Sequence, residues 1–195
     1  MKKIILASSS PRRIEMLQKY KLDPLVVKLP IEEKLSPTER PEQIAMSLAF
    51  EKAFLVAARG NYTRDQIIIG ADTIVVEGQR ILGKPRDEED AFNILKALNG
   101  KEHQVITGFC IMRGDFSLKF VDYEITRVGF RHLSDDKILR YVDTGEPMDK
   151  AGAYAIQGYG QVLVQEIHGS YTNIIGLPIE SLDRILEEYF DISIL

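Results

Sequence analysis

The segment QIIIGADTIVVEGQRILGKP, residues 66–85, decides the fold class. Its first part is an apolar, β-branched run typical of a strand, and Glu77-Gly78-Gln79 predicts a turn. The residues RILGK then predict a second strand that returns beside the first. Because this hairpin is antiparallel and helical segments lie on either side of it, the sequence predicts an α/β protein with a mixed, partly antiparallel sheet flanked by helices.

Outward from this hairpin, strand and helix signals follow one another without strict alternation. We expect strands at residues 3–7, 24–30, 103–114, 117–133 and 161–167. Helices are expected from Pro11 to about Lys21, from the region of residues 36–43 to Arg59, and at residues 87–100, 134–145 and 179–190. Ser10 is the expected N-cap of the first helix. A doubly wound parallel sheet is disfavoured, because the strands do not simply alternate with helices.

Composition narrows the class of protein. The chain has 195 residues, of which 45% are hydrophobic, which predicts one domain over residues 1–195. A net charge of −4 disfavours a general nucleic-acid-binding surface. The single cysteine, Cys110, lies in an apolar run, so we expect a buried strand cysteine and no disulfide framework. The apolar run IILA near the start is too short for a secretion signal, and no segment resembles a membrane span, so a soluble cytoplasmic protein is expected.

The segment LASSSPRR, residues 6–13, places two arginines at the start of the first expected helix. Cations are disfavoured there by the helix dipole, unless an anion binds at the same place. A polyphosphate bound at Ser8-Ser9-Ser10 would compensate for the unfavourable interaction of Arg12 and Arg13 with the helix dipole. The alternative is that both arginines are solvated at the surface. If the phosphate interpretation holds, alanine at either position should leave the ligand-free protein no less thermally stable.

Asp72 lies in an apolar strand, where an unpaired carboxylate is costly to bury. A three-residue hairpin loop would place Asp72 opposite Lys84, and a two-residue loop would shift the pairing by one. Two interpretations remain open at this point. In the first, Asp72 and Lys84 form a structural salt bridge. In the second, Asp72 is a general base or a metal-binding acid, and Lys84 neutralises phosphate charge beside it.

The segment EPMDKAGAYAIQGYG, residues 146–160, is rich in glycine. Tyr154 is a candidate to stack on a ring, and the Gln157 amide carries both a donor and an acceptor, as base recognition requires. The alternative is a plain connecting loop. The chain contains no Walker motif, dinucleotide fingerprint, zinc-ligand spacing or G-x-S-x-G elbow, whereas a divalent cation held by carboxylates and phosphates stays compatible with the sequence.

These segments, in this order, make the chain resemble the Maf family of nucleoside triphosphate pyrophosphatases. The matching stretches are LASSSPRR, GADTIVV, LGKPRDEEDA, LNGKEHQVITG, EPMDKAGAYAIQGYG and GLPIE. The one departure is Ala155, where the family usually has glycine. The resemblance implies a fold like that of inosine triphosphate pyrophosphatases, with an elongated mixed sheet and a cleft between two lobes.

The resemblance also implies an activity and a set of site residues. The activity is hydrolysis of nucleoside triphosphates, dTTP and UTP in this branch, to monophosphate and pyrophosphate with Mg²⁺ or Mn²⁺. Asp72 matches the proposed general base, and Glu33 and Asp72 match metal ligands. The remaining matches are catalytic Lys52 and Lys84, the substrate-binding residues Ser8 and Arg13, and the specificity positions Arg12, Thr73 and Gln157.

Two other functions remain as alternatives. One is a nucleotide-binding regulator of septum formation that does not hydrolyse its ligand, and the other is a pyrophosphatase with broader or non-standard purine substrates. The expected partner is a small nucleotide, with neither a nucleic-acid polymer nor a membrane. The oligomeric state is open, a homodimer included.

Overall fold

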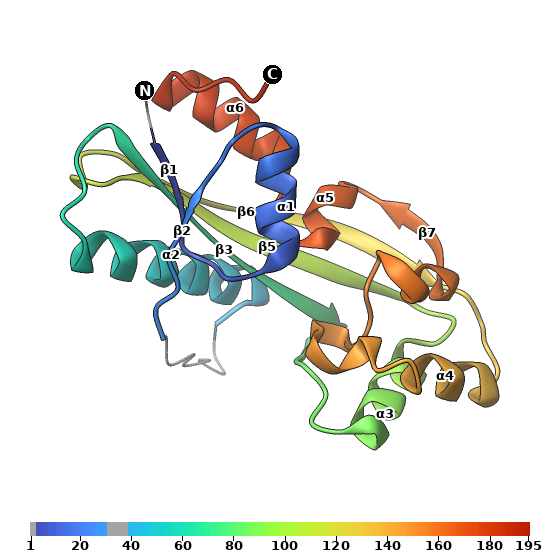
Figure 1. The fold of residues 1–195 in the computed structure, drawn as a ribbon. Helices are drawn as coiled ribbons and strands as arrows, with labels where there is room; N and C mark the ends of the chain where they lie inside the picture. Colours follow the sequence, from blue (N-terminus) through green and yellow to red (C-terminus); the bar gives the residue numbers. More distant parts are fainter. Residues whose placement is uncertain (1–2, 31–38) are drawn as a thin grey trace. The chain divides into compact units, whose positions relative to one another are not determined.

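A computed structural model describes residues 3–30 and 39–195 (Figure 1). Contacts divide the chain into two compact units, each assembled from separate segments. Unit 1 comprises residues 1–72, 107–124 and 176–195, and unit 2 comprises residues 73–106 and 125–175. Three long strands contribute residues to both units, which explains why neither unit is continuous in the sequence.

The sheet is mixed, as the sequence predicts. Its strand order is β2-β1-β3-β5-β6-β7, with β4 paired to β3. Strand β1 pairs in parallel with β2 and β3, whereas the β3–β4 and β6–β7 pairs are antiparallel. The strands are β1 (Lys3–Leu6), β2 (Leu25–Val26), β3 (Gln66–Glu77), β4 (Arg80–Leu82), β5 (Glu102–Arg113), β6 (Lys119–Phe130) and β7 (Val164–His168).

Five of the helices in the described residues lie close to their expected places, and the short helix α5 was not expected from the sequence. The helices are α1 (Pro11–Lys19), α2 (Pro41–Arg59), α3 (Glu88–Leu98), α4 (Asp135–Val142), α5 (Tyr171–Ile175) and α6 (Ile179–Phe190). Three short 3₁₀ helices, η1 (Glu146–Asp149), η2 (Ala151–Ala153) and η3 (Gly158–Leu163), occupy the glycine-rich region. Strand β7 therefore begins at Val164, three residues later than expected, because η3 extends to Leu163.

In unit 1, helix α2 packs closely against the sheet because small residues meet on both sides. A Cβ atom on Gly70 of β3 would lie 2.3 Å from the Ala49 carbonyl oxygen, and one on Gly108 of β5 would lie 2.2 Å from the Ala45 carbonyl oxygen. Ala45, Ala49 and Ala53 recur at intervals of four residues and therefore share one face of α2. Cys110 lies in the same core, buried as expected.

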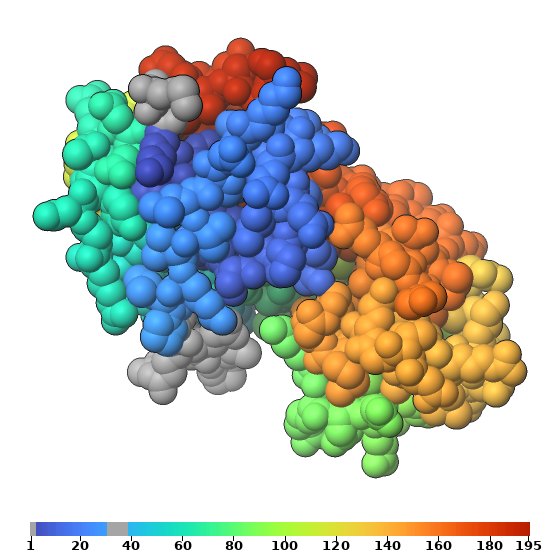
Figure 2. Space-filling model, viewed as in Figure 1, coloured from blue at the N-terminus to red at the C-terminus, as the bar shows by residue number. Residues whose placement is uncertain are grey.

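In unit 2, helices α3 and α4 pack side by side, and Figure 2 shows their segments, green and gold, next to each other on the surface. Both helices share one core with residues of the local strands. Each begins with a capping side chain, Asp87 for α3 and Ser134 for α4, which accepts a backbone hydrogen bond from the third helical residue. The shared core contains Leu95, Val105 and Ile138. None of the helices in the described residues is long and apolar enough to span a membrane.

Candidate functional site

The start of α1 differs from that of α3 and α4. Ser10 occupies the expected N-cap position, but its side chain makes no capping hydrogen bond. Instead the Ser8 hydroxyl accepts hydrogen bonds from the Ser10 backbone N–H and from Arg13 Nη1, each at 3.2 Å. The first turn of α1 contains no acidic residue, whereas that of α3 contains Glu88, Glu89 and Asp90. The positive end of the α1 dipole is therefore not balanced by the helix's own first turn.

Arg13 is buried, with 9% of its surface exposed, and Arg12 is half-buried. Arg13 Nε donates a 2.7 Å hydrogen bond to the carbonyl oxygen of Gly176, which precedes α6. Burial lowers the pKa of Arg13, while the nearby Asp72 carboxylate raises it and Arg12 lowers it further. Sequence reasoning missed the Gly176 contact, because the motif GLPIE gives no sign that a backbone carbonyl is used. This contact argues against the expectation that alanine at position 13 leaves the ligand-free protein no less thermally stable.

Lys52 and Asp72 form an ion pair in unit 1. Lys52 Nζ donates to Asp72 Oδ1, and the two side chains are 18% and 14% exposed. Helix α2 carries Lys52 and packs on Gly70, two residues before Asp72, so the close packing described above positions the pair. Since Arg13 also interacts electrostatically with Asp72, unit 1 gathers Ser8, Arg13, Lys52 and Asp72 in one region.

The hairpin between β3 and β4 has a two-residue loop, not the three-residue loop that would place Asp72 opposite Lys84. Glu77 pairs with Arg80, and Val75 pairs with Leu82, so the loop contains only Gly78 and Gln79. Strand β4 ends at Leu82, before Lys84, which is exposed. The cation bonded to Asp72 is Lys52, a partner that the hairpin register could not reveal.

Unit 2 contains Thr73, Lys84 and Gln157. Thr73 is half-buried and follows Asp72 in β3, so the two side chains point to opposite faces of the strand. The Gly152 N–H donates to the Gly83 carbonyl oxygen at 3.0 Å, which ties the glycine-rich segment to the residue before Lys84. Gln157 is exposed and has extended backbone angles.

Tyr154 does not have the stacking role considered from the sequence. It is 5% exposed, and its ring packs edge-on against His103 and Phe130. The Tyr154 hydroxyl lies 2.8 Å from His103 Nε2, and burial lowers the pKa of His103 to about 4. His103 is therefore neutral at physiological pH, and Tyr154 holds the glycine-rich segment against the core of unit 2.

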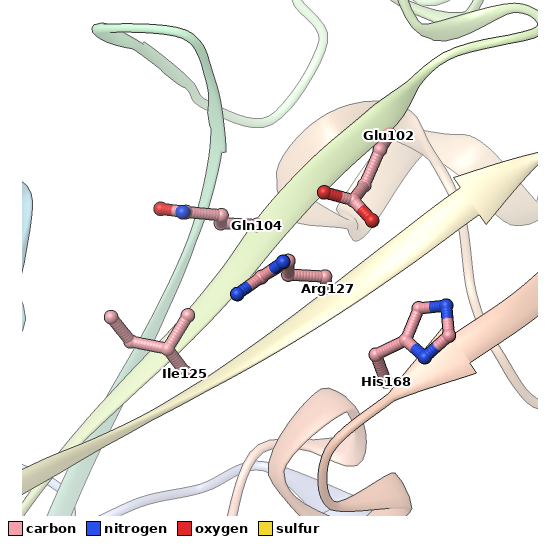
Figure 3. A pocket seen from close by; sticks show the side chains of 5 residues that line it. All are labelled: Glu102, Gln104, Ile125, Arg127 and His168. Carbon is pink, nitrogen blue, oxygen red and sulfur yellow. The ribbon is translucent and has the colours of Figure 1, made fainter.

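A separate pocket of about 490 Å³ lies on the sheet surface of unit 2 (Figure 3). It contains none of the expected site residues. Glu102, Arg127 and His168 are exposed, and Gln104 is half-buried. Along β5, Glu102 and Gln104 alternate with the buried His103 and Val105. This pattern is typical of the solvated face of an antiparallel sheet. The pocket is lined by Glu102, Gln104, Ile125, Arg127 and His168.

The described residues fit one mode of binding a divalent cation. Across residues 3–30 and 39–195, no group of three or more histidine, cysteine, aspartate or glutamate side chains could hold a metal ion. Mg²⁺, however, is often bound by one or two carboxylates together with substrate phosphates. The partly exposed Asp72 carboxylate suits that mode. Glu33, the other expected ligand, lies outside the described residues.

Comparisons with known proteins agree on one family. The protein-family model described as "Maf-like protein" matches residues 3–189. The dTTP/UTP pyrophosphatase of Alkaliphilus oremlandii is 49% identical over 195 residues, covering 100% of both chains. That of Clostridioides difficile is 48% identical over 191 residues, covering 98% of this chain and 97% of the relative.

A solved structure gives independent support for the fold. The Ham1 protein of Staphylococcus aureus has a TM-score of 0.53 and 16% identity, covering 95% of this chain and 98% of that one. At this level of identity the likeness shows the fold alone. It agrees with the mixed α/β class expected from the sequence.

Proposed function

Because the chain belongs to the Maf family, we propose that it hydrolyses nucleoside triphosphates, dTTP and UTP in particular, to monophosphate and pyrophosphate. The observation that carries this proposal is the Lys52–Asp72 ion pair, which lies within electrostatic reach of Arg13 at the start of α1. The proposal treats residues 1–195 as one catalytic domain, since the family match runs through both units.

The start of α1 is proposed to bind the phosphate chain. A helix N-terminus attracts anions through its backbone N–H groups and its dipole, and this one lacks an acidic first turn. Arg12 and Arg13 add guanidinium groups, whose planar geometry suits phosphate oxygens. The Ser8 hydroxyl, which accepts from Arg13, supports the orientation of that guanidinium.

Asp72 is proposed to act as the general base. Lys52 is bonded to Oδ1, so we assign Oδ2 as the atom that accepts a proton from the attacking water. The water oxygen then forms a bond to the α-phosphorus, while the bond from that phosphorus to the bridging oxygen breaks and pyrophosphate leaves. Lys52 orients the carboxylate, and Arg13 and Lys84 offset phosphate charge.

A divalent cation, Mg²⁺ or Mn²⁺, would be held by Asp72 and Glu33 together with substrate phosphates, and it would supply charge stabilisation to the phosphoryl oxygens. Base selection is proposed for Arg12, Thr73 and Gln157. The Gln157 amide is suited to this task because it is exposed and pairs a donor with an acceptor.

The test is a product assay with purified protein and Mg²⁺ across dTTP, UTP, dCTP and dATP. We expect equal amounts of nucleoside monophosphate and pyrophosphate, with the highest kcat/KM for dTTP and UTP. Release of orthophosphate would exclude this reaction. Nucleotide binding without turnover would instead favour the non-hydrolysing regulator, and equal rates on all four substrates would favour a broader pyrophosphatase.

A further inference from the structure

Gln157 lies in a loop whose two sides are bonded to a single pair of side chains in unit 2. On one side, the Ala155 N–H donates to the Tyr141 hydroxyl at 3.2 Å. On the other side, the Glu146 carboxylate accepts from the Tyr159 N–H at 3.1 Å and from the Gly160 N–H at 2.8 Å. The anchored positions are thus two residues before Gln157 and two and three residues after it.

Tyr141 and Glu146 are themselves coupled. The two side chains interact electrostatically, because the pKa of Tyr141 is raised by burial and, to a smaller extent, by the nearby Glu146 carboxylate. The Thr144 hydroxyl donates to the Tyr141 carbonyl oxygen at 2.6 Å and accepts from the Glu146 N–H at 3.2 Å. The end of α4 and the start of η1 therefore form one hydrogen-bonded support.

Two glycines allow the loop to lie this close to its support. A Cβ atom on Gly158 would lie 2.1 Å from Glu146 Oε1, and the φ angle of Gly158 is +86°. A Cβ atom on Gly160 would lie 2.1 Å from the Ala155 carbonyl oxygen, so the two sides of the loop also approach each other. The backbone at Gln157 is consequently held from both sides, while its side chain faces solvent.

We propose that Glu146, assisted by Tyr141, is a positioning residue that fixes the direction of the Gln157 amide and thereby sets base preference. This inference rests on the proposed function, because it gives Gln157 a role in base recognition. Glu146 does not touch the nucleotide in this account. It acts only through the backbone of the loop that carries Gln157.

The decisive variant is Glu146→Gln. Glutamine keeps the size of the side chain, but its NH₂ group would face a backbone N–H in place of a carboxylate oxygen. We expect the preference for dTTP and UTP over dCTP and dATP, measured as a ratio of kcat/KM values, to fall by about tenfold, the change that corresponds to roughly one charge-assisted hydrogen bond. Tyr141→Phe removes only a hydroxyl and should move the ratio in the same direction by less.

The ratio separates positioning from a merely structural role. A variant that is only less stable contains less active protein, which lowers kcat for every nucleotide by one factor and leaves the ratio unchanged. Glu102→Gln, an exposed glutamate in the same unit, is the matched control and should behave as the parent. If Glu146→Gln does not fold, Tyr141→Phe still decides the question.

A double-mutant cycle tests whether Glu146 acts through Gln157. In a Gln157→Ala background, Glu146→Gln should cause no further change in the ratio. A further change of similar size would overturn the inference, as would a parent-like ratio in both single support variants. If selectivity depends on Gln157 but not on Glu146, the inference alone fails. If the parent releases no pyrophosphate, or if Gln157→Ala keeps the parent ratio, the proposed function or its account of base recognition fails, and the inference fails with it.

Discussion

Replacement of Arg13 by alanine should destabilise the protein even without nucleotide. The variant removes the donor for the Gly176 carbonyl oxygen, which accepts a 2.7 Å hydrogen bond from Arg13 Nε in a buried setting. A buried acceptor left without a partner costs about 1–3 kcal/mol. The Ser8 hydroxyl, which also loses its bond to Arg13, is half-buried and can rotate toward water, so its loss adds little.

This loss of stability corresponds to a measurable fall in the melting temperature. For a protein of about this size, 1 kcal/mol corresponds to roughly 2–4 °C in Tm, so Arg13→Ala should melt about 2–12 °C below the parent. Arg12→Ala is the matched control, because Arg12 is half-buried in the same helical turn and its removal relieves an unfavourable interaction with the dipole. That variant should melt at or slightly above the parent temperature.

The assay is thermal unfolding followed by circular dichroism, with and without dTTP in the presence of EDTA. Nucleotide at about 100 times its Kd should stabilise the parent by about 2.7 kcal/mol, and both variants should gain less. If Arg13→Ala melts with the parent in the absence of nucleotide, the Gly176 carbonyl has another donor and the structural role argued for Arg13 is refuted. If Arg13→Ala gains as much from nucleotide as the parent does, its phosphate role is refuted.

Four further predictions follow from the site and its surroundings. Asp72→Asn should fold normally and lose about 10²–10⁴-fold in kcat, and a folded variant with near-normal turnover would make Asp72 structural. Arg12→Ala should change the kcat/KM ratio between UTP and dCTP, and an unchanged ratio would remove Arg12 from base selection. Burial lowers the pKa of His103 from 6.5 to about 4 on folding, so the unfolded state takes up a proton at a higher pH than the folded state does. The free energy of unfolding should therefore fall by about 3 kcal/mol as the pH is lowered from above 6.5 toward 4. Urea titrations should show His103→Gln losing less over that interval than the parent. Burial raises the pKa of Cys110 to about 12, so native protein should resist iodoacetamide at pH 8 and react only when unfolded.

Local signals were sufficient to predict much of the fold. The final helix spans residues 179–190 as expected, and α3 lies within the expected range of residues 87–100. These features depend on neighbouring residues, whose periodicity and capping chemistry are visible in the sequence. The short 3₁₀ helices were missed because glycine permits several backbone conformations, and contacts with Glu146 and Gly83 select among them.

In the candidate site, too, local features could be predicted from the sequence, whereas contacts between distant residues could not. The need of Asp72 for a partner could be inferred from its apolar strand, but the identity of that partner could not. Lys52 reaches it from a helix whose position depends on how α2 packs against β3 and β5. Arg13 illustrates a second difficulty, since one side chain both interacts with the site and bonds to the Gly176 carbonyl. The family resemblance named the site residues, whereas it gave no role to Glu146 or Tyr141.

The close approach of α2 to the sheet has a consequence for how tolerance to mutation would be mapped in this protein. Gly70 and Gly108 have no chemical group to contribute, yet alanine at either would force its Cβ into the α2 backbone. The helix would have to retreat, and it would carry the ammonium of Lys52 away from Asp72. A screen that selects on catalysis would therefore score both glycines as harshly as the charged residues themselves. The short distance between α2 and the sheet, which two glycines permit, therefore keeps Lys52 within reach of Asp72.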